Sequence, residues 1–213
     1  MSSKPADNPR GNLFVIAAPS GAGKTTLVHK LMDANPALRF SVSYTTRPKR
    51  HTETEGKDYF FVTPETFQTM IDAGDFLEHA LVFDHRYGTA KSQVESLLNE
   101  GRNVILEIDW QGAQQVRNHM PECRSIFVLP PSVAELKHRL KGRGTDSVAV
   151  IERRYQDALG DISHWREFDF AVINDDLELA HAELEDIVSG GGDANATSSP
   201  VLADRINAIL QQS

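Results

Sequence analysis

The sequence predicts an α/β fold: a five-stranded parallel sheet flanked by helices, with two insertions. Three observations predict it. A short apolar run passes through a glycine-rich loop into a helical pattern, further buried-strand patterns alternate with helical patterns, and two stretches interrupt that alternation. Strands that alternate with helices indicate a parallel sheet covered on both faces, because each crossover helix packs against the sheet to which it returns.

The first predicted strand is Leu13–Ala17, an apolar run rich in branched residues. A helix is predicted to begin near Lys24, because apolar residues follow it at helical spacing. The loop between the two reads APSGAGKTT. It matches the Walker A phosphate-binding pattern except at its first position, where Ala18 stands in place of glycine.

This loop has the chemistry of a phosphate site. Gly21 and Gly23 let the backbone turn its N–H groups toward an anion, and the helix N-terminus adds partial positive charge. Lys24 can reach the outer phosphates of a nucleotide, and the hydroxyl of Thr25 can bind Mg²⁺. A chance glycine-rich turn is the alternative, but the strand, the lysine and the hydroxyl are all in place. The predicted phosphate-binding residues are Ala18, Pro19, Ser20, Gly21, Ala22, Gly23, Lys24, Thr25 and Thr26.

Four more segments have the pattern of buried strands, and helical patterns lie between or after them. In such sheets ligands bind at the carboxyl ends of the strands, where the glycine-rich loop also lies. The functional site is therefore expected at that edge. The four segments are Phe40–Tyr44, Asn103–Asp109, Arg124–Pro130 and Phe168–Asn174.

Two insertions interrupt the alternation. From about Tyr44 to Gly101 the sequence has short β-like stretches and one helical pattern, which predict a separate lobe. From about Leu136 to His164 it is strongly basic, although the whole chain is acidic. A solvated helix face is the usual meaning of such a run, but its position beside a phosphate site favours a mobile cationic lid.

The composition is that of an ordinary globular domain, with 213 residues and a net charge of −8. The acidic balance argues against a nucleic-acid-binding surface, and no apolar run approaches a membrane span. Cys123 is alone and cannot form an internal disulfide, which is typical of a reducing compartment. We therefore expect a cytoplasmic protein without nucleic-acid or membrane partners, and leave open whether it associates with further copies of itself.

The two ends of the chain are expected to differ from the core. Residues 1–11 are polar and predict a disordered lead. Ser189–Pro200 is rich in glycine and serine, which predicts a flexible linker. Apolar residues at helical spacing follow it, so a terminal helix is expected, with no indication of where it docks.

Residues suited to a second anionic ligand lie in the first insertion. Arginine forks fit phosphate oxygens, and Arg47 and Arg50 follow a predicted strand. One carboxylate, here Glu78, can accept from two adjacent N–H donors, and the N1–H and N2–H₂ edge of guanine presents such a pair. Each residue alone would be ordinary. Together they indicate a pocket with a phosphate end and a base end, lined by Ser43, Arg47, Arg50, Tyr59, Glu78, Tyr87 and Thr89.

From about Gly11 to Val188 the chain resembles the guanylate kinase family. The resemblance rests on motifs in the family's order: the glycine-rich loop, SVSYTTRPKR, GKDYFFV, FLEHA, YGTA, LEIDWQGAQQVR, FVLPPS, LKGRGTDS and VINDDL. It implies Mg²⁺-dependent phosphoryl transfer from ATP to GMP, giving ADP and GDP, with dGMP as a further acceptor, within purine nucleotide metabolism. It also implies a P-loop NTPase core, a GMP-binding lobe and a small helical lid.

The boundaries follow from the patterns and the resemblance together. We assign 12–43, 101–135 and 165–189 to the P-loop core, 44–100 to the GMP-binding lobe and 136–164 to the lid. The remaining residues, 190–213, would form the linker and the C-terminal helix.

At the GMP site the resemblance implies that Glu78 reads the N1/N2 edge of guanine and that Thr89 contacts O6. Ser43 would line the pocket, and Asp109 would act around Mg²⁺ and its waters or orient the arginines. The phosphate of GMP would be held by Arg47, Arg50, Tyr59 and Tyr87.

At the ATP site the resemblance implies that the glycine-rich loop holds the phosphates, with Thr25 on Mg²⁺, and that Asn174 lies near the adenine. Glu107 stands where many relatives carry aspartate, and its role stays open. Three lid arginines would close over the ATP phosphates. The catalytic residues would then be Lys24, Arg47, Arg139, Arg143 and Arg154.

One stretch departs from the family pattern, since many relatives show GNYYGT where this chain has DHRYGT. Asp84 and Arg86 would alter the local charge and tune the affinity for GMP. Two alternatives remain: a P-loop kinase for another phosphate acceptor such as AMP, and a non-catalytic guanylate-kinase-like interaction module. Glu78 argues against AMP, which lacks the paired donors, and the intact Lys24 and Thr25 argue against the module.

Overall fold

The computed structural model describes residues 9–82, 84–141 and 148–211, and its core is a five-stranded parallel sheet. The strand order is β2-β7-β1-β8-β9, and each neighbouring pair is parallel. The predicted α/β fold with a five-stranded parallel sheet is thereby confirmed. The strands are β1 (Leu13–Ala17), β2 (Arg39–Phe40), β7 (Val104–Glu107), β8 (Arg124–Leu129) and β9 (Phe170–Ile173).

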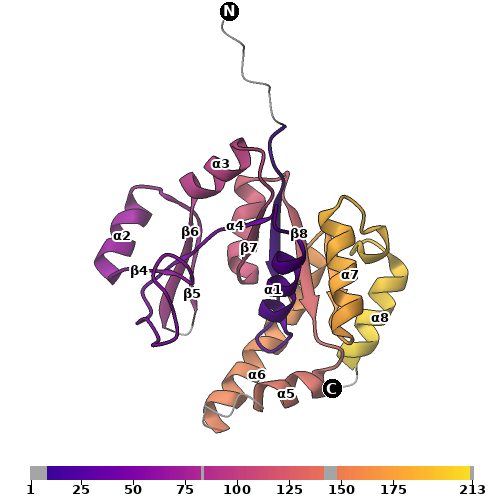
Figure 1. Cartoon of the computed structure of the whole chain (residues 1–213). Helices are drawn as coiled ribbons and strands as arrows, with labels where there is room; N and C mark the ends of the chain where they lie inside the picture. The colour runs from indigo at the N-terminus through magenta and orange to yellow at the C-terminus, as the bar shows by residue number, and fades with distance from the viewer. Residues whose placement is uncertain (1–8, 83, 142–147, 212–213) are drawn as a thin grey trace, which may run out of the picture.

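Helices cover both faces of this sheet (Figure 1). Alternate residues of β1 join two different buried clusters, one on each face, because successive side chains of a strand point to opposite sides. A strand that is apolar on both faces is what a doubly covered parallel sheet requires. One cluster includes α4 (Trp110–His119) and α6 (Val148–Ile162), and the other includes α1 (Lys24–Ala34) and α7 (Leu177–Val188).

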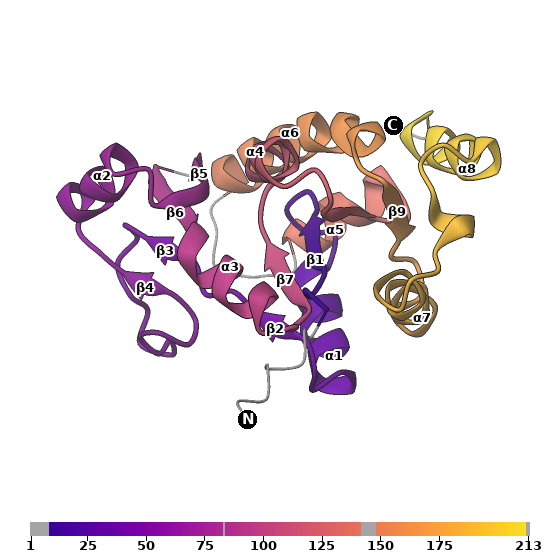
Figure 2. The same cartoon turned by 90° about the horizontal axis from the view of Figure 1, so that it is seen from above.

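The first insertion forms a second, four-stranded sheet beside the core, in the order β4-β3-β6-β5 (Figure 2). Strands β5 and β6 pair antiparallel, and the rings of Phe67 and Phe76 stack 4.5 Å apart beneath them. The elements are β3 (Tyr44–Thr45), β4 (Phe60–Phe61), α2 (Pro64–Asp72), β5 (Phe76–Val82), β6 (His85–Ala90) and α3 (Lys91–Asn99), which returns the chain to the core.

The strand predicted over Phe40–Tyr44 is divided between the two sheets. Phe40 ends β2 in the core, and Tyr44 begins β3 in the second sheet. Between them Ser41 is buried, and its hydroxyl donates to the side-chain oxygen of Gln93 at 2.7 Å. One predicted strand is therefore divided between two sheets, and the local sequence pattern does not indicate the division.

The second insertion begins with α5 (Val133–Lys141), which packs against the glycine-rich loop. Leu136 and Leu140 are buried, and a Cβ at Gly21 would lie 3.1–3.2 Å from their side chains. Residues 142–147 lie outside the described structure. Helix α6 follows, and then a 3₁₀ turn, η1 (Ser163–Glu167), carries the chain back to β9.

The tail differs from the flexible linker that its composition predicts. After α7 the chain forms a second 3₁₀ turn, η2 (Asp193–Asn195), in which Asn195 is buried. The amide of Asn195 donates to the carbonyl of Ala171 and to the carboxylate of Glu183. The guanidinium of Arg124 donates to the carbonyls of Ile187 and Gly191. These long-range hydrogen bonds order a glycine-rich segment that would be flexible in isolation.

The predicted terminal helix is α8 (Pro200–Gln211), and it docks beside the end of α6 and η1. Its residues Leu202 and Ile206 join the same buried cluster as Trp165 and Phe168. The guanidinium of Arg166 adds a hydrogen bond to the side chain of Asn207. The helix thus completes the core on the side from which the lid segment leaves it.

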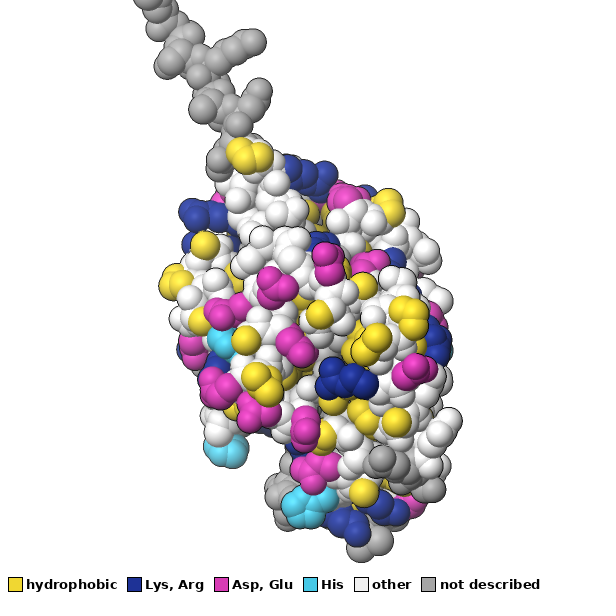
Figure 3. All heavy atoms as spheres, turned by 90° about the vertical axis from the view of Figure 1, so that its right-hand side faces the viewer, with side chains coloured by type: hydrophobic (Ala, Val, Ile, Leu, Met, Phe, Trp, Pro, Cys, Tyr) yellow, Lys and Arg dark blue, Asp and Glu magenta, His cyan; other side chains and the backbone are white. Residues whose placement is uncertain are grey.

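The face that carries α7 and α8 shows interspersed acidic and apolar side chains (Figure 3). Its exposed apolar residues include Leu179 and Val201. Within the described residues, none of the helices is both long and apolar enough to cross a membrane. Of the predicted disordered lead, 1–11, residues 1–8 lie outside the described residues. Gly11 is ordered against the core, because its N–H donates to the carbonyl of Leu98 at 2.9 Å.

Replacing Ile206 by alanine is expected to lower the free energy of unfolding by about 2–5 kcal/mol, because the side chain is fully buried and its removal leaves a cavity. Val201→Ala on the same helix is the control, since that side chain is 72 % exposed and should change stability by less than about 0.5 kcal/mol. Urea unfolding measures both. Equal effects of the two substitutions would contradict the docking of α8.

Candidate functional site

The glycine-rich loop between β1 and α1 adopts a left-handed turn at two positions, with φ of +93° at both Gly21 and Gly23. At Gly23 a Cβ would also lie only 2.4 Å from the side-chain nitrogen of Asn174, so glycine is required twice over. Gly23 caps α1 without a side-chain hydrogen bond. The first N–H groups of the helix therefore face the loop, where an anion can accept from them.

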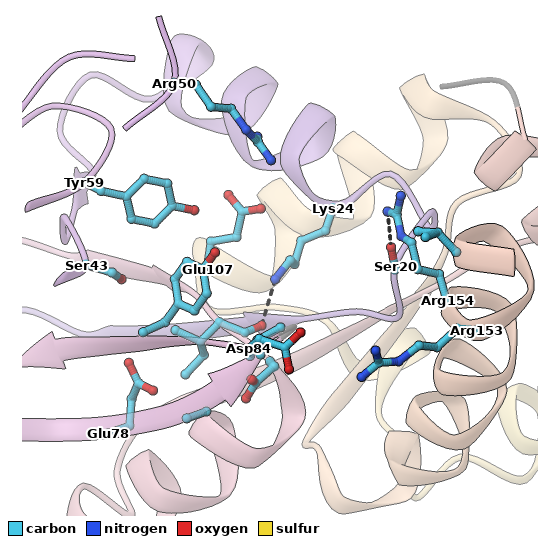
Figure 4. A pocket seen from close by; sticks show the side chains of 16 residues that line it. Ser20, Lys24, Ser43, Arg50, Tyr59, Glu78, Asp84, Glu107, Arg153 and Arg154 are labelled. Carbon is cyan, nitrogen blue, oxygen red and sulfur yellow. Dashed lines mark hydrogen bonds between the residues drawn. The ribbon is translucent and has the colours of Figure 1, made fainter. Parts of the chain in front are cut away.

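Two side chains at the start of α1 are held by the neighbouring strand β7 and the residues after it. The ammonium of Lys24 donates to the carbonyl of Ile108 at 2.7 Å (Figure 4). The hydroxyl of Thr25 donates to the carboxylate of Glu107 at 2.5 Å. The glycine-rich loop is thus tied to the strand beside β1, at the carboxyl edge of the sheet where the site is predicted.

A cavity of about 1090 Å³ opens between this loop, the second sheet and α6 (Figure 4). Charged groups of both signs line it: the cations Lys24, Arg50, Arg153 and Arg154, and the carboxylates Glu78, Asp84, Glu107 and Asp109. The predicted site residues that line the cavity are Ser20, Lys24, Ser43, Arg50, Tyr59, Glu78, Tyr87, Asp109 and Arg154.

Glu78 is the buried end of this cavity, and its side chain accepts from the hydroxyl of Thr89 at 2.6 Å. The hydroxyl of Ser43 lies 3.4 Å from that of Thr89. A Cβ at Gly112, in the first turn of α4, would lie 2.6 Å from a carboxylate oxygen of Glu78, so the glycine makes room for it. Thr89 itself is buried behind Glu78 and does not line the cavity.

Burial is the main cause that raises the pKa of Glu78 to about 7; the hydrogen bond from Thr89 opposes the shift, and the nearby charge of Asp109 adds to it. Asp109 is fixed as the N-cap of α4, where it accepts from the N–H of Gly112 at 2.7 Å. A buried carboxyl with a perturbed pKa in a cavity is a strong candidate for a functional group.

Arg47 is the predicted phosphate ligand that the structure turns away from the cavity. It is absent from the described residues that line the cavity, and its side chain is 12 % exposed. Both terminal nitrogens of its guanidinium donate to the carboxylate of Glu53, at 3.1 and 2.5 Å. Arg50, three residues later, does face the cavity (Figure 4).

A second cavity, of about 840 Å³, lies on the other side of the glycine-rich loop, toward α4 and α6. The ring of Trp110 stacks on that of His164, and its N–H donates to Asp161 at 3.0 Å. Burial raises the pKa of Asp161 to about 6. The predicted loop residues that line this cavity are Ala18, Pro19, Ser20, Gly21, Gly23, Lys24, Thr25 and Thr26.

Of the remaining predicted residues, Asn174 and Arg139 pack against the loop, and Arg154 contacts it while lining the first cavity. The amide of Asn174 donates to the carbonyl of Ala22 at 2.8 Å, and the guanidinium of Arg139 donates to the carbonyls of Ala22 and Asn174. Arg154, from α6, donates to the hydroxyl of Ser20 at 2.7 Å. Arg143, predicted as a lid arginine, lies outside the described residues.

Four further residues belong to this site: sequence reasoning assigned Asp84 only a tuning role, left the role of Glu107 open, and did not single out Glu53 or Arg153. Glu107 and Arg153 line both cavities, Asp84 lines the first, and Glu53 pairs with Arg47. Asp84 also has a φ of +69°, a left-handed conformation that glycine adopts more readily. Asp84 and Glu107 stand where the sequence departs from the family pattern, which is a local signal. Glu53 and Arg153 carry no signal that distinguishes them from solvated charges.

Comparison with known proteins decides the family. The guanylate kinase family model matches residues 10–190. A guanylate kinase of Nitrosococcus oceani is 57 % identical over 84 % of this chain and 88 % of its own length. One of Hydrogenovibrio crunogenus is 50 % identical over 95 % of this chain and 98 % of its own.

The chain belongs to the guanylate kinase family. Among solved structures, a guanylate kinase of Anaplasma phagocytophilum superposes with a TM-score of 0.71 at 33 % identity, covering 85 % of this chain and 86 % of that one. The family expected from the sequence motifs is thereby confirmed.

Glu78 gives the stability of the protein a specific pH dependence. Its carboxyl has a pKa of about 7 when folded, against about 4.3 in an unfolded chain. Between these values the folded protein keeps a proton that the unfolded chain has lost, so the free energy of unfolding falls as pH rises through that window. The expected contribution is up to about 3 kcal/mol.

Urea unfolding at pH 5 and pH 8 measures this contribution as the difference between the wild type and Glu78→Gln, which stays neutral and can still accept from Thr89. The variant should lose less stability between the two pH values. Glu55→Gln, an exposed carboxyl in the same lobe, should follow the wild type. Identical pH slopes for wild type and Glu78→Gln would contradict the perturbed pKa.

Proposed function

We infer that this chain transfers the terminal phosphoryl group of ATP to GMP, giving ADP and GDP, and that dGMP is accepted as well. Membership of the guanylate kinase family supports this function. The observation in the molecule that supports it most is the buried carboxyl of Glu78, in the same cavity as the loop lysine Lys24.

We propose that GMP lies in the larger cavity with its base at Glu78 and its phosphate toward Lys24. The carboxylate of Glu78 is already desolvated, so pairing with the N1–H and N2–H₂ donors of guanine costs little further desolvation free energy. A base without those donors would leave the buried carboxylate without hydrogen-bond partners and would bind less tightly. Ser43 would line the base end. Thr89, which is buried and does not line the cavity, would act there through its hydrogen bond to Glu78 in place of the predicted contact to O6.

The phosphate end would be formed by Arg50, Tyr59 and Tyr87, which line the cavity, and Asp109 would lie between the two substrates. Arg47, which the sequence predicts as a further phosphate ligand, would support this end from its contact with Glu53.

We propose that ATP binds with its phosphates in the glycine-rich loop and its adenine near Asn174. The boundaries proposed for the core (12–43, 101–135, 165–189), the lobe (44–100) and the lid (136–164) follow from this arrangement. The lid arginines Arg139, Arg143 and Arg154 would close over the phosphates.

Mg²⁺ is part of the proposal, and the residues present fit it. The hydroxyl of Thr25 and the carboxylate of Glu107 form a pair of hard oxygen donors, and Asp109 stands near them on the same wall. Within the described residues, His, Cys, Asp and Glu form no cluster that could hold a metal by itself. That suits Mg²⁺, which binds through one or two protein groups and the substrate phosphates. When bound it would neutralise charge on the phosphates.

The chemistry requires positive charge and no general base. The attacking group is a phosphate oxygen of GMP, which is already ionised at neutral pH because a phosphate monoester has a second pKa of about 6. The obstacle is the repulsion between two anions and the charge on the transferred group. Lys24 and the arginines oppose it, and they act by position and charge.

Water competes with GMP as the nucleophile, so the site should react only when closed. The cationic residues outside the loop come from the lobe (Arg50) and from the lid segment (Arg154). Closure of both over the core would assemble them around the phosphates and exclude water. ATP hydrolysis without GMP, at the rate of transfer, would contradict this gating.

ADP release in a coupled assay with Mg·ATP tests the function, with GMP, AMP, UMP and CMP as acceptors side by side. Turnover is expected with GMP alone. Lys24→Ala should reduce kcat by at least about 100-fold, since it removes a charge that faces the transferred group. Glu78→Ala should lose most of the preference for GMP. Lack of turnover with every nucleotide would favour a binding module and contradict the proposal.

GMP affinity is expected to fall as pH drops below about 7. The base end needs the carboxylate form of Glu78, whose pKa in the free protein is about 7, so binding releases a proton when the group starts protonated. The second ionisation of the GMP phosphate, near pH 6, adds to the loss at lower pH. Calorimetric titration from pH 5.5 to 8.5 measures it, and Glu78→Gln should retain only the part due to the phosphate.

A further inference from the structure

The carboxylate of Glu53 is the partner of the guanidinium of Arg47. Both terminal nitrogens of the arginine donate to the two carboxylate oxygens, in the fork geometry that arginine uses for carboxylates and phosphates. The two side chains are only 12 % and 13 % exposed. The hydrogen bond from Arg47 lowers the pKa of Glu53, so the carboxylate stays ionised.

The same carboxylate fixes the chain around Arg50. The backbone N–H of Arg50 donates to Glu53 at 2.7 Å, and the N–H of Glu53 donates back to the carbonyl of Arg50 at 3.1 Å. One guanidinium nitrogen of Arg50 lies 4.0 Å from a carboxylate oxygen, while the side chain itself is 70 % exposed and faces the cavity. Glu53 therefore closes the turn from which Arg50 reaches the cavity.

Arg47 in turn stands behind the tyrosines of the cavity. Its guanidinium carbon lies 5.5 Å from the centre of the Tyr59 ring and 5.8 Å from that of Phe61. A side-chain hydrogen bond with Tyr87 contributes to the raised pKa of Arg47. The rings of Tyr59 and Tyr87, which line the cavity, meet edge to face at 5.8 Å. The Arg47–Glu53 pair thus supports the wall that two predicted phosphate ligands share.

We propose that Glu53 is a positioning residue for the acceptor phosphate: it anchors Arg47 behind Tyr59 and Tyr87 and fixes the turn that presents Arg50. The proposal rests on GMP being the acceptor and adds a residue to its recognition. Two effects oppose each other. A carboxylate near a phosphate repels it, but the charge of Glu53 is paired with Arg47. Removing this carboxylate would free the side chains of Arg47 and Arg50, which GMP binding would then have to order. Because the pair is largely buried and doubly hydrogen-bonded, ordering is the larger effect.

The test uses the full chain with Glu53→Gln. Glutamine has nearly the same size, but its single oxygen cannot accept from both arms of the guanidinium, and its NH₂ group would face a donor. KM for GMP is expected to rise about tenfold, while KM for ATP and kcat at saturating GMP stay within about threefold. Glu55→Gln is the matched control, because it removes the same charge two residues away, on an exposed side chain, and should leave KM for GMP within about twofold.

Arg47→Lys and the double variant measure the coupling. Lysine keeps the charge and loses the fork, so each single change breaks the same contact, and the double variant should raise KM for GMP little more than either alone. Calorimetric binding of GMP provides the same comparison without turnover.

An unchanged KM for GMP in Glu53→Gln would overturn the proposal, and so would a lower one, which would mean that Glu53 competes with the phosphate for Arg47. A parallel rise of KM for ATP, with a lowered melting temperature, would also overturn it by showing a general structural role. Absence of turnover and of GMP binding in the wild type would instead be a failure of the proposed function itself.

Discussion

The left-handed turn at Gly21 and Gly23 is the constraint on which the site depends. It lets β1 end and α1 begin within a few residues, so that the open N–H groups of the helix face the carboxyl edge of the sheet. Neighbouring elements then pack directly against the loop: Asn174 occupies the space that a side chain at Gly23 would need, and the leucines of α5 cover Gly21. The glycine-rich loop is therefore part of the core, and Asn174 and α5 are positioned by packing against it.

Around this fixed loop, two glutamates differ in the direction of their pKa shifts because their surroundings differ. Glu78 is buried with a hydroxyl as its partner, which raises its pKa to about 7 and prepares it for neutral or positive donors. Glu53 is less deeply buried and has a guanidinium as its partner, which lowers its pKa and keeps it ionised. In the proposed site, the same residue type serves base recognition in one case and the ordering of arginines in the other, because its partner and its burial differ.

Patterning predicted the five parallel strands and the terminal helix because buried strands and amphipathic helices leave a local record in the sequence. Two predictions were wrong. Phe40–Tyr44 is not one strand but is divided between two sheets, and Ser189–Pro200, predicted as a flexible linker, contains an ordered 3₁₀ turn. In that segment Asn195 and the carbonyl of Gly191 find partners on β9, α7 and β8, far away in the chain. Local composition does not indicate such distant partners, and their hydrogen bonds order a segment whose composition alone predicts flexibility.

The sequence by itself determined the family, the phosphate loop and the residue types of the second pocket, because spacing along one loop is a local property. The tertiary structure alone decided which of those residues face the cavity. It turned Arg47 onto Glu53, hid Thr89 behind Glu78, and brought Arg153 and Asp84, from separate elements, to one cavity wall. The orientation and burial of a side chain depend on how distant segments pack. Charged residues that are indistinguishable in the sequence therefore have different surroundings in the fold.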